Sequence, residues 1–233
     1  MEGYLVTAVE YLVILSLVGA QVLDIYAVMI RARVNVDGTT QVLAVANWVQ
    51  YLARILNMIS VFGISILLEK KLAIIGVPEL FGYSMFIGLF VILFVCLSRY
   101  ACAPLRVLQV LGFTGVFGTL GKKPYWWRVK FNFFNKVTFF SSVVGILINL
   151  AIIMPFVLSV KYPDIRMTLA YTGQLLNFCA SIIMFTYVDK VFFRALDEGN
   201  EVSCASSIIA GKVVSQGILV LGVIVVFLSI HDF

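Results

Sequence analysis

The chain has 233 residues, of which 62% are hydrophobic and only 12% are charged, with a formal net charge of +5 and a mean hydropathy of +1.05. Soluble domains carry about 25% charged residues. The composition therefore excludes an ordinary water-soluble domain and indicates an integral membrane protein.

Six apolar runs have the length of about 20 residues that an α-helix needs to cross a bilayer. They are expected at residues 4–30, 40–68, 80–98, 136–160, 167–188 and 206–230. The first is expected to be a permanent helix, because the chain starts with Glu2 and no cation, whereas a secretory leader starts with a positive region. We predict one domain, residues 1–233, that is an all-α polytopic bundle of about six transmembrane helices.

The region between the third and fourth predicted helices differs from the rest. Residues 103–121 are apolar but contain Arg106, Gln109 and four glycines, which favours an interfacial or re-entrant segment over a seventh span. Residues 122–136 contain a mixture of cations and aromatic rings of the kind that anchors proteins at the lipid headgroups. The same cluster could attract anionic membrane lipids. Single-strand nucleic-acid binders use similar residues, but beside membrane spans we predict no nucleic-acid partner.

The distribution of Lys and Arg predicts the topology. The first, third and fifth loops carry eleven of these residues, and the second and fourth carry four. By the positive-inside rule the odd-numbered loops are cytoplasmic, so both termini are expected outside. This prediction requires an even number of spans and fails if residues 103–121 cross the membrane.

No motif indicates catalysis or a bound cofactor. His231 is the only histidine, and the four cysteines lack the spacing of metal ligands. The sequence has no Ser/His/Asp set, no phosphate-binding glycine loop and no ATPase domain. We expect neither an enzyme nor a metal site, and any transport would be passive or driven by an ion or the membrane potential.

A polar stripe runs along the second predicted helix. Asn47, Gln50, Arg54 and Asn57 are spaced three, four and three residues apart, so they share one helical face. A charge at the centre of a bilayer helix costs on the order of 2.5–3.5 kcal/mol on insertion scales, so it normally faces a protein partner or a wet cavity. Arg54 is the central candidate for a binding residue.

Three other predicted helices carry polar residues on one face. They are Glu10, Gln21 and Asp24 in the first helix, Gln174, Asn177 and Ser181 in the fifth, and Lys212 and Gln216 in the sixth. Such side chains can simply join helices by hydrogen bonds. Four helices with polar stripes, however, predict a polar interior formed by helices one, two, five and six, with helices three and four facing lipid or a second subunit.

Two of these charged residues allow two interpretations each. Asp24 could pair with an arginine at the membrane interface near Arg31, or it could pair with Arg54 and orient it, since an unpaired buried charge costs several kcal/mol. Lys212 could extend to the interface or be a second cation in the cavity. The sequence does not choose between them.

Several of these residues lie in motifs that resemble the Amj family of lipid II flippases. The motifs are Leu23-Asp24-Ile-Tyr26-Ala27-Val-Met-Ile-Arg31, Asn47-x6-Arg54-x2-Asn57-Met58, Gln174-Leu175-x-Asn177-x2-Ala180, Tyr187-Val188-Asp189 and Gly211-Lys-Val-Val-Ser215. Their order and spacing agree over nearly the whole chain. Ile25, Val28 and the run Ser60–Gly63 depart from the family pattern, and the last departure removes a proline.

The resemblance implies a bacterial plasma-membrane protein that moves undecaprenyl-linked peptidoglycan precursor, lipid II, from the inner to the outer leaflet as an alternate to MurJ. Our hypothesis is that Arg54 binds the pyrophosphate and that Asp24 holds or releases Arg54. The path of the head is expected to involve Asn47, Gln50, Asn57, Asn177 and Gln216, with Gln174, Lys212 and Glu10 as further candidates. Because six helices enclose little space, we expect a homodimer or an open lateral groove.

Two other classes of protein remain as alternatives. One is a non-transporting scaffold or assembly protein, in which the polar stripes only join helices. The other is a small solute carrier coupled to an ion, with Glu10 and Asp24 as proton or ion sites.

Overall fold

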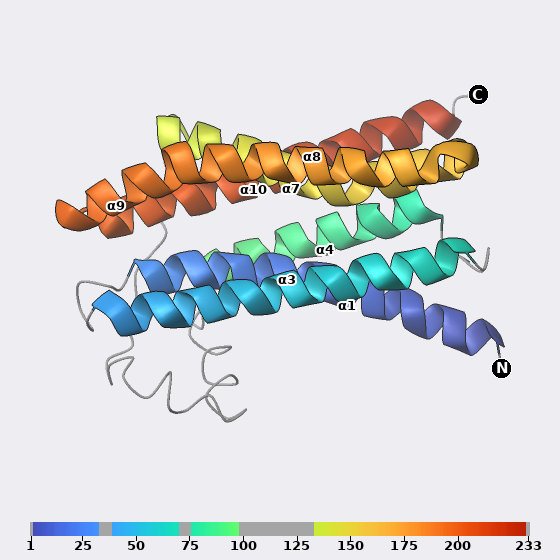
Figure 1. Cartoon of the computed structure of the whole chain (residues 1–233), viewed down its shortest axis with the longest axis horizontal. Coiled ribbons are helices and arrows are strands. Elements are labelled where there is room, and N and C mark those ends of the chain that lie inside the picture. The colour runs from blue at the N-terminus through green and yellow to red at the C-terminus, as the bar shows by residue number, and fades with distance from the viewer. Residues whose placement is uncertain (1, 33–38, 70–75, 98–132, 232–233) are drawn as a thin grey trace.

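A computed structural model describes residues 2–32, 39–69, 76–97 and 133–231. These residues form helices and no strand (Figure 1). The helices are α1 (Glu2–Arg31), α3 (Thr39–Glu69), α4 (Val77–Leu97), α7 (Lys136–Lys161), α8 (Arg166–Ile183), α9 (Lys190–Asp197) and α10 (Glu201–His231), with a 3-10 turn η1 (Pro163–Ile165) and a π-helical turn η2 (Met184–Asp189). Residues 103–121 and most of the basic aromatic cluster lie outside the described residues.

Within the described part of the chain, six helical stretches are long and apolar enough to cross a membrane. The prediction of an all-α polytopic bundle with six such helices is confirmed. Figure 1 shows that α4 ends and α7 begins at the same end of the bundle, and that α1 starts near the end at which α10 finishes.

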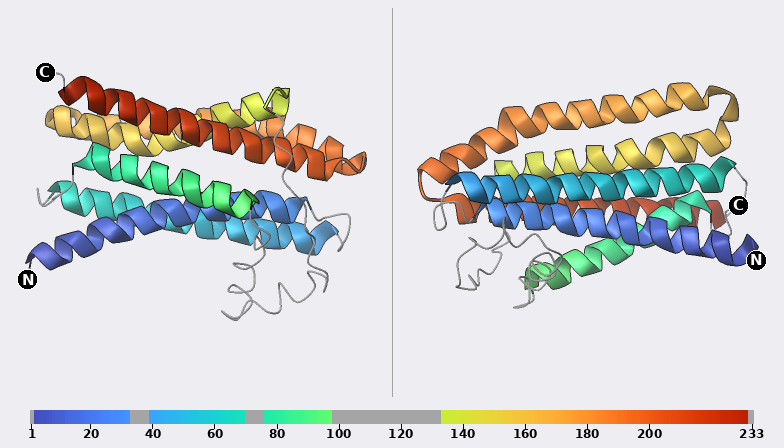
Figure 2. Two further views of the ribbon diagram at one scale, coloured as in Figure 1. Left: turned by 180° about the vertical axis from the view of Figure 1, so that it is seen from behind. Right: turned by 60° about the horizontal axis from the view of Figure 1, so that its bottom comes forward.

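The helices form two groups. The group α1, α3 and α4 packs around α1, and the group α7, α8 and α10 packs around α7, with α4 and α10 as the main contact between the groups. The left view of Figure 2 shows these groups as an upper and a lower layer along the length of the molecule. Each group is therefore built from helices that follow one another in the chain.

The two helices without polar stripes also pack inside the bundle. Helices three and four, which are α4 and α7, were expected to face lipid or a second subunit. α4 exposes large apolar side chains such as Phe86, Phe90 and Phe94, and it also contacts α1 and α10, while α7 contacts α8 and α10. Small residues permit these contacts, as is common between helices in membranes. A Cβ added to Gly211 of α10 would lie 2.6 Å from the Thr138 carbonyl oxygen of α7. A helix without a polar stripe can still be central.

The fifth helix is longer than the apolar run predicts. The sequence indicates an end near residue 188, where charged residues begin, but the chain continues through η2 and α9 to Asp197. Gly199, with φ of 72°, then ends α9, and the Asn200 N–H donates to the Ala195 carbonyl at 2.7 Å in a Schellman motif. The apolar run predicted most of this helical stretch and missed its amphipathic end, α9.

Candidate functional site

The first component of the site is a charge network at one end of the bundle, formed by Asp24, Arg31, Asp189 and Lys212. Lys212 of α10 pairs with Asp24 of α1, and Arg31 at the end of α1 lies 3.7 Å from Asp189 of η2. Lys212 and Arg31 both stabilise the Asp189 carboxylate electrostatically. The side chains are 16% to 35% exposed, so this network of two acids and two bases is largely withdrawn from the surface.

Arg31 also binds the polar stripe of α3. Its guanidinium donates to Gln50 Oε1 at 2.7 Å and to Asn47 Oδ1 at 3.3 Å. Two residues predicted to line a binding site with Arg54 are therefore partners of Arg31. The network connects α1 and α3 to η2 and α10, so it joins the two groups of helices.

Asp24 does not hold Arg54 in this structure, because Asp24 pairs with Lys212. The alternative partner near the interface, Arg31, pairs with Asp189 instead. Helix rotation explains the difference. A Cβ on Gly19 of α1 would lie 3.0 Å from Leu56 of α3, so Asp24 lies within about one turn of the level of Arg54, but its side chain is on the side of α1 that faces α10.

A second polar cluster lies one helical turn from the Asp24–Lys212 pair. Gln216 of α10 donates to Gln21 Oε1 of α1 at 3.0 Å and to the Met85 carbonyl of α4 at 3.2 Å. A Cβ on Gly88 would lie 2.0 Å from Gln21 Oε1. Gln216 is 2% exposed, so it joins three helices in the interior, and it does not line an accessible path as predicted.

Arg54 lies on a different surface. It is at the midpoint of α3, roughly 22 Å from either end at 1.5 Å per residue, and its side chain is exposed. Its guanidinium carbon lies 5.7 Å from the centroid of the Tyr51 ring. No acidic side chain among the described residues forms an ion pair with it. Arg54 is therefore a cation at the middle of a membrane-length helix, without a carboxylate partner in the part of the chain that the structure describes.

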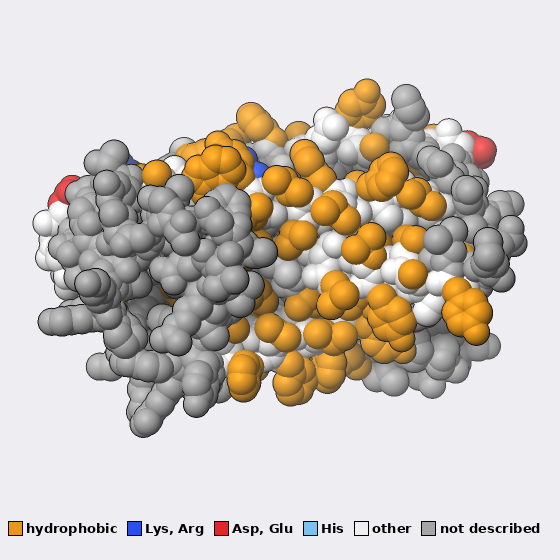
Figure 3. Space-filling model, turned by 90° about the horizontal axis from the view of Figure 1, so that it is seen from below, with side chains coloured by type: hydrophobic (Ala, Val, Ile, Leu, Met, Phe, Trp, Pro, Cys, Tyr) orange, Lys and Arg blue, Asp and Glu red, His pale blue; other side chains and the backbone are white. Residues whose placement is uncertain are grey.

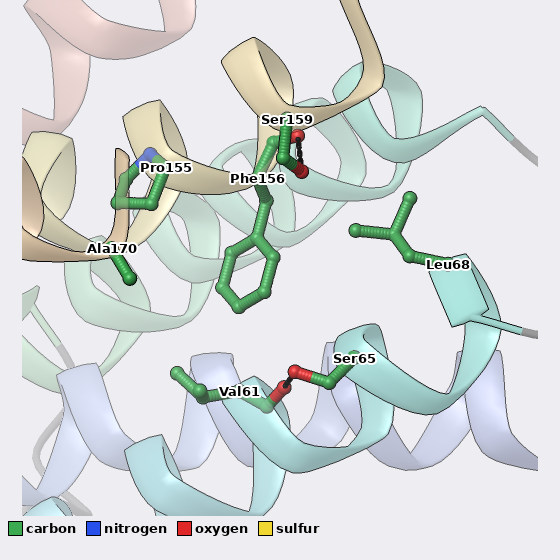
Figure 4. A pocket seen from close by; sticks show the side chains of 7 residues that line it. All are labelled: Val61, Ser65, Leu68, Pro155, Phe156, Ser159 and Ala170. Carbon is green, nitrogen blue, oxygen red and sulfur yellow. Dashed lines mark hydrogen bonds between the residues drawn. The ribbon is translucent and has the colours of Figure 1, made fainter. Parts of the chain in front are cut away.

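The face of α3 that carries Arg54 also lines a pocket near the C-terminal end of the helix. This apolar pocket is formed by Val61, Ser65, Leu68, Pro155, Phe156, Ser159 and Ala170, from α3, α7 and α8 (Figure 4). Val61 lies two turns beyond Arg54 on the same face. On α8, Asn177 lies two turns beyond Ala170, again on the same face.

Because α3 and α8 run in opposite directions (Figure 1), these spacings place Arg54 and Asn177 at about the same level. By the same reasoning Asn57 and Gln174 lie at the same level. Each is one turn from the pocket, on the side toward Arg54 and Asn177. Further along, η2 brings Asp189 to Arg31, the partner of Asn47 and Gln50. We call this strip the polar groove; its side chains are Asn47, Gln50, Arg54 and Asn57 on α3 and Gln174, Asn177 and Ser181 on α8.

The π-helical turn decides where Asp189 points. In an uninterrupted α-helix Asp189 would be rotated by roughly 120° from Asn177, and the extra residue of a π turn brings it to within about 20°. Asp189 therefore lies on the same side as the polar groove. Such turns are frequent at functional sites, and no sequence pattern predicted this one.

The predicted site residues thus divide into three sets. The groove contains Asn47, Gln50, Arg54, Asn57, Gln174 and Asn177, the charge network contains Asp24 and Lys212, and the interior contains Gln216 and Glu10, the latter 3% exposed. Arg31 and Asp189 were not predicted from the sequence as site residues. Both occur in the motifs Leu23–Arg31 and Tyr187-Val188-Asp189, so the signal was present but was interpreted as helix ends.

The fold and site define an all-α, multi-pass membrane protein with an exposed cation at the middle of a membrane-length helix. Compared with known proteins, the chain matches no protein-family model, no curated protein and no solved structure.

Proposed function

We propose that this chain is a lipid II flippase of the Amj type, which moves undecaprenyl-pyrophosphate-linked peptidoglycan precursor from the inner to the outer leaflet of the bacterial plasma membrane. The observation that carries the proposal is Arg54, an exposed cation at the centre of a membrane-length helix with no ion-pair partner among the described residues. A cation in that position lowers the cost of bringing a phosphate group into the bilayer.

The residues around Arg54 suit this substrate. A guanidinium donates paired hydrogen bonds to phosphate oxygens, and such charge-assisted bonds are about twice as strong as neutral ones. The amides of Asn57, Gln174 and Asn177 can bond to the hydroxyl and amide groups of a glycopeptide head. The exposure of Arg54, Gln174 and Asn177 favours an open lateral groove, from which most of the long polyprenyl tail can extend into lipid.

In this proposal the charge network is the part of the protein that rearranges during transport. Asp24 does not occupy Arg54, which leaves the guanidinium available for an anion. The ion pairs Asp24–Lys212 and Arg31–Asp189 join the two groups of helices at one end of the groove. Their rearrangement would change the side of the membrane to which the groove opens.

The test is rescue of bacteria depleted of their essential lipid II flippase, with lipid II in the outer leaflet as the readout. The native chain should restore flipping, and Arg54→Ala should lower it by about tenfold to a hundredfold, the effect of losing a hydrogen-bonded charge worth about 1.5–3 kcal/mol. Arg194→Ala is the matched control, because Arg194 is an exposed cation on α9, away from the groove. Protein levels in the membrane must be equal.

Rescue by Arg54→Ala equal to the native chain would remove Arg54 from the mechanism. Failure of the native chain itself, with normal protein level, would favour the two other classes. A scaffold should tolerate Arg54→Gln in an assembly assay, whereas an ion-coupled carrier should show uptake of a soluble solute that collapses with the ion gradient.

A further inference from the structure

The apolar pocket at the end of the polar groove has a volume of about 280 Å³. Figure 4 shows Phe156 of α7 pointing toward Val61 of α3, with Ala170 of α8 at one side and Leu68 at the other. Small-molecule sites begin at roughly 300 Å³. The pocket can therefore hold a segment of a ligand and not a whole one.

The polar atoms of the pocket are already used. The Ser65 hydroxyl donates to the Val61 carbonyl at 2.9 Å, and the Ser159 hydroxyl donates to the Phe156 carbonyl at 2.8 Å. Pro155 has no N–H to offer. The wall thus presents mainly hydrocarbon, and its occupant must be apolar.

The position of the pocket selects the occupant. Val61 and Ala170 lie seven residues from Arg54 and Asn177, so the pocket is roughly 10 Å from the cation along the groove. The first few isoprene units of a lipid can cover that distance. A resident phospholipid keeps its phosphate at the membrane surface, whereas Arg54 is roughly 22 Å from either end of α3.

We propose that the apolar pocket binds the isoprenoid chain of the same polyprenyl lipid whose phosphate binds Arg54. The inference rests on the proposed function and adds to it a second contact, which fixes the chain in the groove next to the head. The groove then binds a lipid at two points, with charge at Arg54 and hydrocarbon at Phe156 and Ala170.

The test is photo-crosslinking of the full chain in phospholipid vesicles. One probe is undecaprenyl phosphate with a diazirine on its chain, and the other is phosphatidylglycerol with a diazirine on an acyl chain. The polyprenyl probe should label the peptides that contain Phe156 and Ala170. Ala170→Phe should reduce this labelling about tenfold, the loss expected when about two methylene groups are excluded.

Ala8→Phe is the matched control, since Ala8 is an exposed alanine on α1, outside the pocket, and its labelling pattern should equal that of the native chain. Ser65→Leu fills the pocket from α3 and is a second variant should Ala170→Phe fail to fold. Arg54→Ala should lower labelling by the polyprenyl probe and leave labelling by phosphatidylglycerol unchanged.

Equal labelling of the pocket by both probes would overturn the proposal in favour of a bilayer acyl chain. Unchanged labelling in both pocket variants would overturn it as well. Rescue by the native chain without labelling of the pocket would support the flippase function and overturn the proposed isoprenoid site. Labelling of the pocket without rescue would support the isoprenoid site and overturn the flippase function.

Discussion

Lys212 and Asp24 illustrate how one ion pair acts at the residue scale. Both are polar residues in apolar helices, and each is the nearest charge of opposite sign to the other in the structure. An ion pair that is partly withdrawn from water stabilises little by itself, but removal of one partner leaves the other charge unsatisfied. The pair therefore makes α1 and α10 dependent on each other.

The first prediction at this scale concerns Lys212→Ala. It should lower the free energy of unfolding by about 1–3 kcal/mol because Asp24 loses its partner, which corresponds to a fall in Tm on the order of 2–10 °C. Thermal unfolding in detergent measures it. Lys190→Ala, at an exposed cation of α9, should leave Tm unchanged.

Exchange of the two charges, Asp24→Lys with Lys212→Asp, should recover most of the lost free energy of unfolding, since the stability effects of substitutions at residues in contact are not additive. A double variant as unstable as the sum of its single variants would show that the pair contributes nothing. The exchange also replaces the positive charge of Lys212, which stabilises the Asp189 carboxylate, by a negative one. It therefore tests whether Asp189 needs a cation at position 212.

At the scale of elements, close contact between helices depends on a few glycines. A Cβ on Gly173 of α8 would lie 2.5 Å from the Ala151 carbonyl oxygen and 2.7 Å from Pro155 of α7. The first of these atoms is backbone and cannot move without shifting the helix. Gly217 of α10, in contrast, has no such neighbour within 4 Å.

Gly173→Ala is therefore predicted to destabilise the protein by about 1–3 kcal/mol, the usual cost of overpacking. Gly217→Ala is the matched control and should be neutral or stabilising by up to about 1 kcal/mol, because alanine favours a helix over glycine. Thermal unfolding compares them. Equal effects of the two substitutions would show that α7 and α8 do not approach as closely as the structure has them.

At the scale of the whole molecule, much of the described surface is apolar. Figure 3 shows one face on which hydrophobic side chains cover the central part. On α4 the exposed large apolar side chains are Tyr83, Phe86, Ile87, Phe90 and Phe94. A surface of this extent and composition is suited to contact with lipid tails.

Accessibility to water provides the prediction at this scale. In a chain whose own cysteines are replaced, Asn177→Cys should react with a charged, water-soluble thiol reagent, because the groove is polar and the reactive species is the thiolate. Phe90→Cys, on the exposed apolar face of α4, should not react. The measurement is the rate of labelling in vesicles, and equal rates would mean that the groove is as dry as the lipid-facing side.

The class of protein and the six apolar helices follow from composition and hydropathy alone, because the bilayer requires about 20 consecutive apolar residues for each span. Helical periodicity also put Asn47, Gln50, Arg54 and Asn57 on one face of α3, and Gln174 and Asn177 on one face of α8. These properties are local. The side on which each terminus lies remains a prediction from the Lys and Arg counts.

Which polar side chains meet depends on how the helices pack against one another. Asp24 could reach more than one cation by position along its helix, and the rotation and packing of α1 against α10 selected Lys212. The π turn brought Asp189 to Arg31, and the glycine contacts brought α7 and α10 together. Periodicity gives the face of each helix, but the direction of that face depends on contacts between residues far apart in the chain.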